Sequence, residues 1–408
     1  MLLYENKKEK LLNFLKIGIN PFKKFVATGE IKEEIGLVNS RINQLNKIKE
    51  LIDNNANIVL PIIGETGIGK THLYWALKNK LYYHNTIYIS LENYKQLFYN
   101  IYSEFMEGMG PEVLRSITSA LCNKWGALER KFGFFHMADI DKVKTTAYNN
   151  LSQNFEDNIA LNDVLIAITS HQLNPYKKTE AERWLLGELM DSKDLSHLNL
   201  LYDLRKSSHA YTVLKIIIEN SKLGTVLFID DFEKIISLMK PEAALSIFEP
   251  EWLYGDIKAS PGILTAQKVL EKIINLEKIK GLRIIITLNS TKSLDEIKKF
   301  LTELGKNVSI NFLEPIFLSN FNEDDVYEFY IKKMEEFLIS INFLDFIEEY
   351  PEYPDKFFPI SKSTLKTIFN VTQGNPREII KHLIKIFSEI IYSDKNLIDI
   401  LEPYSKQN

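Results

Sequence analysis

Four short apolar runs, rich in β-branched residues, constrain the fold of this chain more than any other sequence feature. Polar or glycine-containing turns bound them, a pattern typical of strands that are buried on both faces of a parallel sheet. The runs are Ile58 to Ile63, Thr86 to Leu91, Thr225 to Ile229 and Arg283 to Leu288. Stretches of helical period lie between or after them, such as His72 to Leu81 and Leu264 to Lys278. Strands that alternate with helices predict a doubly wound α/β core.

A fifth strand is expected within the segment from Val308 to Leu318, which would complete a five-stranded parallel sheet. The first predicted strand contains Pro61, which cannot donate a hydrogen bond to a neighbouring strand. We therefore expect that strand to be irregular or to begin later than its apolar residues suggest.

Long segments with a helical pattern interrupt or flank the predicted α/β core along the chain. About 130 residues separate the second predicted strand from the third, far more than the dozen or so that a parallel crossover needs. We expect an N-terminal extension at 1–39, core segments at 40–94 and 221–320, and a large helical insertion at 95–220. Residues 321–408 are expected to form a C-terminal helical subdomain, or lid, which begins at the acidic stretch Asn322 to Asp325. Within it, the segment from Phe346 to Pro359 predicts a loop.

The composition is that of an ordinary globular protein and excludes several kinds of site. A formal net charge of -4 gives no global attraction to nucleic acid. The single cysteine, Cys122, cannot form an internal disulfide, and the Cys and His residues lack zinc-ligand spacing. The first residues do not form a secretory signal, and no run approaches the roughly 18 apolar residues of a membrane span. We therefore expect a cytoplasmic protein with no membrane association.

A glycine-rich loop lies between the first predicted strand and a predicted helix. Its residues are Gly64, Glu65, Thr66, Gly67, Ile68, Gly69, Lys70 and Thr71. In this strand-loop-helix context the glycines allow successive N–H groups to point at a phosphate, and the helix N-terminus adds partial positive charge. Lys70 is expected to reach the β- and γ-phosphates and Thr71 to ligate Mg²⁺. The sequence therefore predicts an ATP-binding loop, with His72 counted among the nucleotide-binding residues.

Two carboxylates follow the third predicted strand, where a magnesium site is expected. Asp230 is expected to hold Mg²⁺ through water, and Asp231 is expected to polarise the attacking water. Glu233 is a weaker candidate for that base, because two further residues past the strand end can turn its side chain away. The alternative is a strand that simply ends in a solvated acidic turn.

Two more polar residues complete the predicted site. Asn289 follows the fourth predicted strand, where its amide can orient a water near the phosphate. Arg377 follows Gly374, Asn375 and Pro376 at the start of a helix in the C-terminal subdomain, where it can sense the γ-phosphate. Taken alone, such a helix start followed by a solvated arginine is common. The order of all these parts along the chain makes the prediction stronger.

These motifs resemble those of the AAA+ ATPases, in the branch of the origin-recognition and archaeal-initiator ATPases and the STAND-like switches. The resemblance covers Ser40 to Tyr94 and Gly224 to Ser388. It implies that 64–71 is the Walker A motif, that Phe228 to Asp231 is Walker B, and that Asn289 and Arg377 are sensors 1 and 2. It also implies that the segment Ser40 to Leu45 cups the adenine through Arg41, although Ser40 and Gln44 replace the glycine and glutamate of that family's motif.

A shorter likeness lies in the insertion, where the stretch from Ala181 to Glu188 is similar to a Trp-Leu-x-Gly-Glu pattern of BREX-type phage-defence ATPases. The alternative is that Trp184 is simply buried on an amphipathic helix. The resemblance to AAA+ proteins also implies an arginine that reaches the next subunit's γ-phosphate, yet no arginine lies between Arg283 and Arg377. The candidates to replace it are Lys298, Lys299, Lys306, Arg183 and Arg205, although lysine lacks the planar fork of arginine.

The sequence therefore predicts an ATPase that uses ATP and Mg²⁺ as a switch or assembly motor, as a homo-oligomer or with a partner protein. The resemblance implies a DNA-linked process such as replication, mobile-element activity or antiviral defence. One alternative is a weakly hydrolysing or non-hydrolysing scaffold whose insertion binds a protein. A sequence-specific DNA binder is disfavoured, because the residues after Arg377 leave no room for a winged helix, whereas lysine-rich surfaces allow non-specific contact with DNA phosphates.

Overall fold

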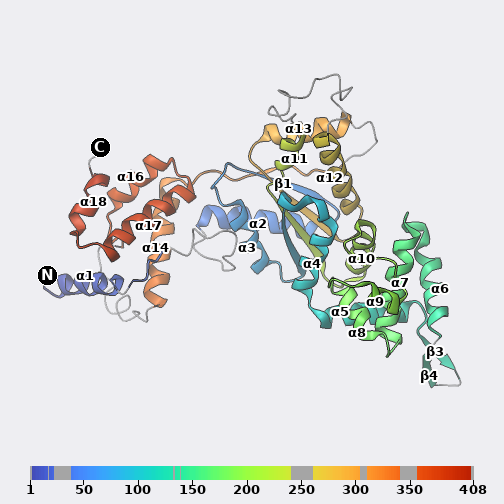
Figure 1. Cartoon of the computed structure of the whole chain (residues 1–408). Helices are drawn as coiled ribbons and strands as arrows, with labels where there is room; N and C mark the ends of the chain where they lie inside the picture. The colour runs from blue at the N-terminus through green and yellow to red at the C-terminus, as the bar shows by residue number, and fades with distance from the viewer. Residues whose placement is uncertain are drawn as a thin grey trace. The chain divides into compact units, whose positions relative to one another are not determined.

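The structure is a computed structural model of the whole chain (Figure 1). It describes residues 2–16, 18–22, 38–131, 134–137, 139–239, 261–303, 310–340 and 356–405. Two compact units are formed from alternating segments of the chain. The first unit comprises Met1–Leu51, Ile63–Lys80 and Ile316–Asn408, and the second comprises Ile52–Ile62 and Leu81–Pro315. Lys306, the start of the predicted fifth strand at 308–309, and most of the predicted loop at 346–359 lie outside the described residues.

A five-stranded parallel sheet confirms the predicted α/β class. Its strand order is β2-β5-β6-β1-β7. In the two pairs that involve β5, His84 to Ser90 lie opposite Gly224 to Asp230, and Thr225 to Ile229 lie opposite Leu282 to Ile286. The strands are β1 (Val59–Ile63), β2 (His84–Ser90), β5 (Gly224–Asp230), β6 (Leu282–Leu288) and β7 (Ile316–Phe317). The fifth strand is therefore much shorter than its predicted segment, although Phe312 adds an isolated parallel bridge to Val59.

Strand β1 begins at Val59, one residue after the start of the apolar run at Ile58, and continues through Pro61 to Ile63. The amide of Val59 donates to the carbonyl of Asn311, and the carbonyl of Val59 accepts from the amide of Leu313. Because backbone groups alternate along a strand, the position of Pro61 faces the same side as Val59. On that side the described residues provide the isolated bridge to Phe312 and then the short strand β7, which begins only at Ile316.

Helices cover the sheet of the second unit, and several belong to the segment that the sequence assigns to an insertion. Helix α4 packs against β2, α10 packs against α4, and α12 and α13 both pack against β6 (Figure 1). The remaining helices of the segment extend from this layer, together with an antiparallel hairpin of β3 and β4 that the sequence did not predict. The elements of 91–220 are η2 (Leu91–Gln96), α4 (Leu97–Met109), α5 (Pro111–Lys124), β3 (Leu128–Lys131), β4 (Phe134–Met137), α6 (Ile140–Leu151), η3 (Ser152–Asn154), α7 (Asn158–Leu173), α8 (Lys178–Leu185), α9 (Ser192–Leu198) and α10 (Ser207–Asn220).

Three more helices of the second unit follow the strands that carry the candidate site. They are α11 (Lys234–Met239), α12 (Pro261–Glu277) and α13 (Thr291–Glu303). Helix α11 begins four residues after the end of β5, and α13 begins three residues after the end of β6. The two short connections are what place the side chains at the carboxyl ends of these strands.

The C-terminal helices of the first unit share one apolar core with the N-terminal segment. Leu11, Leu15 and Phe22 lie in this core and are almost fully buried. Asn20 reinforces the packing, because its amide donates to the carbonyl of Ile384 at 3.0 Å and to the hydroxyl of Ser388 at 3.1 Å. The helices of this unit are α1 (Leu2–Leu15), α2 (Asn39–Asn54, of which 39–51 belong here), α3 (Lys70–Lys80), α14 (Glu323–Ser340), α16 (Lys362–Thr372), α17 (Pro376–Tyr392) and α18 (Leu397–Ser405). The described residues at 2–16 and 18–22 therefore pack with the C-terminal helices of the first unit.

The predicted acidic helix start is present at α14. Asn322 accepts from the amide of Asp325 at 2.7 Å, while the carboxylate of Asp325 accepts from the amide of Asn322 at 3.1 Å. This reciprocal cap satisfies two backbone donors at the helix start. Among the described residues, no helix combines the length and apolar character needed to cross a membrane.

Phe22 should contribute strongly to the stability of the first unit. Its ring is fully buried, with its centroid 4.9 Å from that of Phe387 and 5.9 Å from that of Tyr330. We expect Phe22→Ala to lower the free energy of unfolding by about 3–5 kcal/mol, because the change leaves a cavity. Ile398→Ala, at a side chain that is 80% exposed, should change it by less than about 0.5 kcal/mol. Urea denaturation of both variants checks this, and equal midpoints would contradict it.

Candidate functional site

The glycine-rich loop has the local geometry that its sequence predicts. Strand β1 ends at Ile63 and helix α3 begins at Lys70, so the loop joins a strand to a helix N-terminus. Gly67 and Gly69 have φ angles of 87° and 100°, in the left-handed region that other residues rarely adopt. The first hydrogen bonds of the helix follow at once, with the amide of Leu73 donating to the carbonyl of Gly69 at 3.0 Å.

Lys70 is held over this loop. Its side chain is only 8% exposed, and its ammonium group donates to the carbonyls of Gly64 at 2.6 Å and Glu65 at 3.2 Å. Thr71 follows in the first turn of α3 and is half-buried. A buried cation at a helix N-terminus, surrounded by loop backbone, is suited to bind an anionic group such as phosphate.

Two glycines of the loop are required by close contacts. A Cβ atom on Gly64 would lie 2.9 Å from Ile68 Cγ2 and 3.1 Å from the carbonyl oxygen of Leu318. A Cβ atom on Gly67 would lie 2.8 Å from Asn375 Oδ1 and 3.0 Å from the Cβ of Arg377. Both sets of distances are shorter than a Cβ atom tolerates. A residue other than glycine at either position would therefore force its neighbours to move.

The start of helix α17 contacts the loop directly. The amide of Arg377 donates to the carbonyl of Gly67 at 3.2 Å, and the side-chain amide of Asn375 donates to the carbonyl of Thr66 at 3.1 Å. Asn375 also caps α17 by accepting from the amides of Arg377 and Glu378. The structure therefore places the predicted sensor Arg377 beside the loop, with an exposed side chain.

Arg41, which precedes the loop in the sequence, also contacts the loop backbone. The residue is 7% exposed, and its guanidinium donates to the carbonyls of Ile68 at 3.2 Å and Ser319 at 2.6 Å, and to the side chain of Gln44 at 2.7 Å. Its carbon Cζ lies 5.4 Å from the centre of the Phe321 ring. Burial lowers the pKa of Arg41, and the nearby Asp325 opposes that change. The observed partners of Arg41 are thus protein groups that position Ile68 within the loop.

His72 lies in α3 next to the predicted ligand Thr71. Its Nε2 atom is buried and has no hydrogen-bond partner among the described residues. Burial lowers the pKa of His72 most, and the charges of Lys333 and Arg41 lower it further. The imidazole is therefore neutral at neutral pH, and its ring offers one polar atom that the surrounding protein leaves unsatisfied.

In the second unit, Asp230 is the last residue of β5 and is 4% exposed. Its Oδ2 accepts from the hydroxyl of Tyr88 at 2.9 Å, and its Oδ1 accepts from the hydroxyl of Thr287 at 2.5 Å. Tyr88 lies on β2 and Thr287 on β6, so both neighbouring strands hold this carboxylate.

Asp231 turns the chain away from the strand. Its φ angle is 53°, a left-handed conformation that is uncommon for a residue other than glycine. Its amide donates to Asp230 Oδ1 and to Thr287 Oγ1, both at 3.0 Å. Its side chain is 45% exposed, and one carboxylate oxygen lies 3.7 Å from the ammonium of Lys234.

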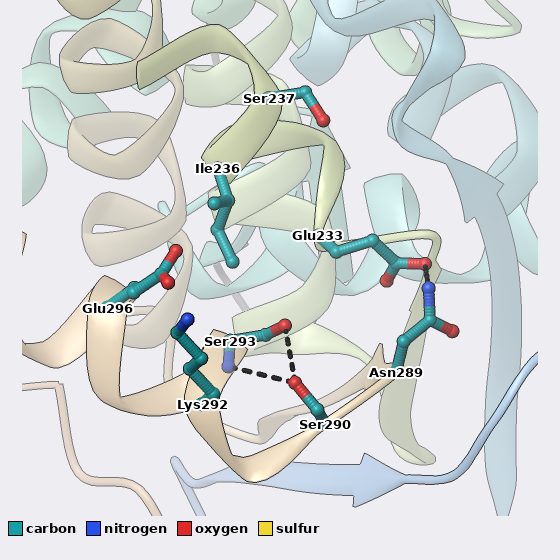
Figure 2. A pocket seen from close by; sticks show the side chains of 8 residues that line it. All are labelled: Glu233, Ile236, Ser237, Asn289, Ser290, Lys292, Ser293 and Glu296. Atoms are coloured by element: carbon teal, nitrogen blue, oxygen red, sulfur yellow. Dashed lines mark hydrogen bonds between the residues drawn. The ribbon is translucent and has the colours of Figure 1, made fainter. Parts of the chain in front are cut away.

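Glu233, the weaker candidate base, lies next to the predicted sensor Asn289. The side-chain amide of Asn289 donates to Glu233 Oε1 at 2.5 Å. Figure 2 shows the two side chains pointing toward one another from the turn after β5 and from the end of β6. They line a pocket of about 300 Å³ together with Ile236, Ser237, Ser290, Lys292, Ser293 and Glu296. Glu233 lies two residues after Asp231, whose backbone is left-handed.

The oxygen donors of Thr71 and Asp230 are of the kind that Mg²⁺ prefers, since it is usually bound by one or two protein oxygens, waters and substrate phosphates. Within the described ranges, no group of three or more His, Cys, Asp and Glu side chains forms a metal site. Thr71 and Asp230 therefore each offer an oxygen of the kind that Mg²⁺ binds.

The residues proposed to replace the missing arginine have other contacts. Arg183 pairs with Glu188 at 2.9 Å and Asp194 at 3.3 Å, and Arg205 pairs with Asp203 at 2.5 Å. Lys299 lies 3.8 Å from Glu303, and the ammonium of Lys298 lies 5.8 Å from the centre of the Phe312 ring. Trp184 is fully buried and donates to the carbonyl of Tyr202 at 3.1 Å, as the simpler interpretation of its motif predicts.

The two left-handed glycines of the loop should differ in their tolerance of a side chain. Gly69→Ala adds only the cost of the backbone conformation, about 1–2 kcal/mol, because nothing lies within 4 Å of its Cβ position. Gly67→Ala adds the same cost and also forces Asn375 and Arg377 to move. We therefore expect Gly67→Ala to be the more destabilising of the two. Thermal unfolding of the two variants checks this, and equal loss of stability would contradict the contact at Gly67.

Comparison with models of known protein families gives no match to this chain, and comparison with curated proteins gives no match either. The functional assignment consequently rests on the residues and contacts described above.

Proposed function

We propose that this chain is an ATPase that binds ATP at the loop of residues 64–71. The observation that carries the proposal is the buried ammonium of Lys70, held against the carbonyls of Gly64 and Glu65 where α3 begins. Left-handed glycines, a helix N-terminus and a lysine in this arrangement favour the phosphates of a nucleotide. The strand order β2-β5-β6-β1-β7 is consistent with an AAA+ layout, which is the finer fold that we propose.

The proposed roles of the other site residues follow from the AAA+ resemblance. It implies that Thr71 and Asp230 serve Mg²⁺, Asp230 through water, and that Asn289 orients the attacking water. It also implies that Arg377 senses the γ-phosphate. The backbone contact between Arg377 and Gly67 supports this last role, because it places the start of α17 against the loop.

The proposed outcome of nucleotide binding is a switch in which the C-terminal helices respond to the occupant of the loop. Asn375 and Arg377 both bond the loop, so a ligand that changes the loop backbone changes the environment of α17. Assembly into a homo-oligomer or with a partner protein is the proposed consequence, in a DNA-linked process such as replication, mobile-element activity or phage defence. The DNA-linked part rests on the AAA+ resemblance alone.

Removing the lysine tests nucleotide binding. Lys70→Ala should abolish detectable binding of a fluorescent ATP analogue in the presence of Mg²⁺, because the phosphates lose the cation at the centre of the loop. Lys78→Ala, an exposed lysine on the same helix, serves as the matched control and should keep the wild-type affinity within about twofold, as expected for a surface residue. An unchanged affinity in the Lys70 variant would exclude the loop as the binding site.

A second candidate function is a nucleotide-bound scaffold that hydrolyses ATP slowly or not at all. The ion pairs that engage Arg183 and Arg205 favour it, because neither guanidinium is available without breaking contacts with its own chain. An arginine supplied to the γ-phosphate accelerates transfer by about 10³–10⁵-fold in related chemistry, so its loss would matter greatly.

Phosphate release and mass measurement separate the two functions. The switch predicts steady phosphate release that Lys70→Ala abolishes, and assembly in a slowly hydrolysed ATP analogue but not in ADP. The scaffold predicts that the wild-type chain releases phosphate no faster than Lys70→Ala, with and without DNA. It also predicts that the protein has the same mass with ADP as with the slowly hydrolysed ATP analogue.

A further inference from the structure

Two adjacent tyrosines, Tyr82 and Tyr83, occupy the turn that leads into β2. The amide of His84 donates to the carbonyl of Leu81 at 3.0 Å, which closes a β-turn with both tyrosines at its central positions. Such positions usually carry Gly, Pro, Asn, Asp or Ser, so turn chemistry does not require aromatic rings here. Each tyrosine is 80% exposed, and within the described part of the chain neither side chain makes a hydrogen bond or a ring contact. Packing therefore does not account for the two rings either.

This turn lies at the amino end of the parallel sheet, beside the segments that lead into two other strands. His84 lies opposite Gly224 at the start of β5, and Thr225 lies opposite Leu282 at the start of β6. Because neighbouring strands of a sheet lie about 4.8 Å apart, the segments that precede them form one continuous surface, which we call the amino edge. Its three segments are 81–83, 221–223 and 278–281.

Three exposed lysines, which we call the edge lysines, lie on the same surface. Lys222 precedes β5, and Lys278 and Lys280 precede β6. None of the three ammonium groups forms an ion pair with a residue that the structure describes, and Lys278 only donates to the side chain of Asn275 at 3.4 Å. The edge lysines can therefore contact an anionic partner without breaking an ion pair within the described chain.

The carboxylates nearest to the amino edge already have protein partners. Glu219 accepts from the ammonium of Lys215 at 2.7 Å and from the backbone amide of Lys280 at 3.2 Å. Glu277 accepts from a backbone amide at 2.7 Å, and Asp53 lies 3.9 Å from the imidazole of the first residue of β2. The edge lysines consequently give this surface a local positive charge, although the whole chain carries a formal charge of -4.

Flat aromatic faces beside lysines match the chemistry of a single nucleic-acid strand. Unpaired bases can stack on tyrosine rings while ammonium groups contact the phosphates between them. A duplex keeps its bases stacked on one another, so it offers the rings no base face. A lipid surface would require more apolar area than two phenol rings and Leu223, which is 38% exposed, provide. The amino edge therefore favours a single strand over a duplex or a membrane.

We propose that the amino edge binds single-stranded nucleic acid, with bases stacked on Tyr82 and Tyr83 and phosphates held by the edge lysines. Stacking and phosphate contacts do not read the edges of the bases, so binding has little sequence preference. None of these residues belongs to the glycine-rich loop, so strand binding at the amino edge does not depend on the proposed ATPase function.

Fluorescence anisotropy with a labelled oligothymidylate and the full chain, without nucleotide and at low salt, tests the stacking. Tyr82→Ala combined with Tyr83→Ala should weaken binding by more than about 25-fold, because stacking on one ring contributes about 5–150-fold. Tyr82→Phe combined with Tyr83→Phe keeps both rings and should bind within about twofold of the wild-type chain. The matched control is Tyr176→Ala, at a tyrosine of the insertion that is 87% exposed, and it should also stay within about twofold.

A salt titration tests the phosphate contacts. Replacing all three edge lysines by alanine should make the slope of log affinity against log salt shallower by about 2, because each phosphate contact of a single strand contributes about 0.7. The matched control replaces three exposed lysines of the insertion, Lys124, Lys178 and Lys193, by alanine and should keep the wild-type slope. Unchanged midpoints of thermal unfolding show that the variants remain folded.

The outcomes separate this proposal from its alternatives. Binding of oligothymidylate, of oligouridylate or of both supports it, and the tighter of the two identifies DNA or RNA as the partner. Equal affinity of the double-alanine variant and the wild-type chain overturns it, as does a duplex bound as tightly as the single strand. Absence of oligonucleotide binding also overturns it, including when the chain binds vesicles that contain phosphatidylserine instead. An unchanged ATP affinity in Lys70→Ala would remove the proposed nucleotide site and leave strand binding intact.

Discussion

Burial of both faces of the parallel sheet is the constraint on which the rest of the structure depends. Strands β1, β5 and β6 consist almost wholly of apolar residues, because helices cover the sheet and leave little room for polar groups. Polar side chains therefore collect where the strands end. Asp230, Asn289 and the glycine-rich loop all occur at such ends, and each is followed within a few residues by a helix.

The sequence predicted those parts that depend on local patterns. Apolar runs located the strands to within a few residues, and the glycines with Lys70 located the loop and the helix start. The predicted positions of Asp230 and Asn289 at strand ends are confirmed. Each of these features follows from residues that are neighbours in the chain, so periodicity and turn chemistry were sufficient to find them.

Features that depend on distant residues were not predictable in the same way. Leu11, Leu15 and Phe22 share a core with α17, although hundreds of positions separate them, and nothing in their sequence names that partner. The contact of Glu233 with Asn289 joins residues that lie 56 positions apart, and the left-handed conformation of Asp231 has no clear signal in an Asp-Asp-Phe-Glu sequence. The pairing around Pro61 could not be known from β1 alone, because it depends on Asn311 and Leu313, which lie far along the chain.

The two hydrogen bonds that join the loop to the start of α17 have a thermodynamic consequence. Each such bond contributes about 0.5–1.5 kcal/mol. Together they give a coupling free energy of up to about 3 kcal/mol between the loop conformation and the position of α17. Linkage is reciprocal, so whatever favours one arrangement of α17 changes the affinity of the loop for its ligand by the same factor, up to about 150-fold. A molecule that binds only the helical subdomain would then act as an effector of the loop without touching it.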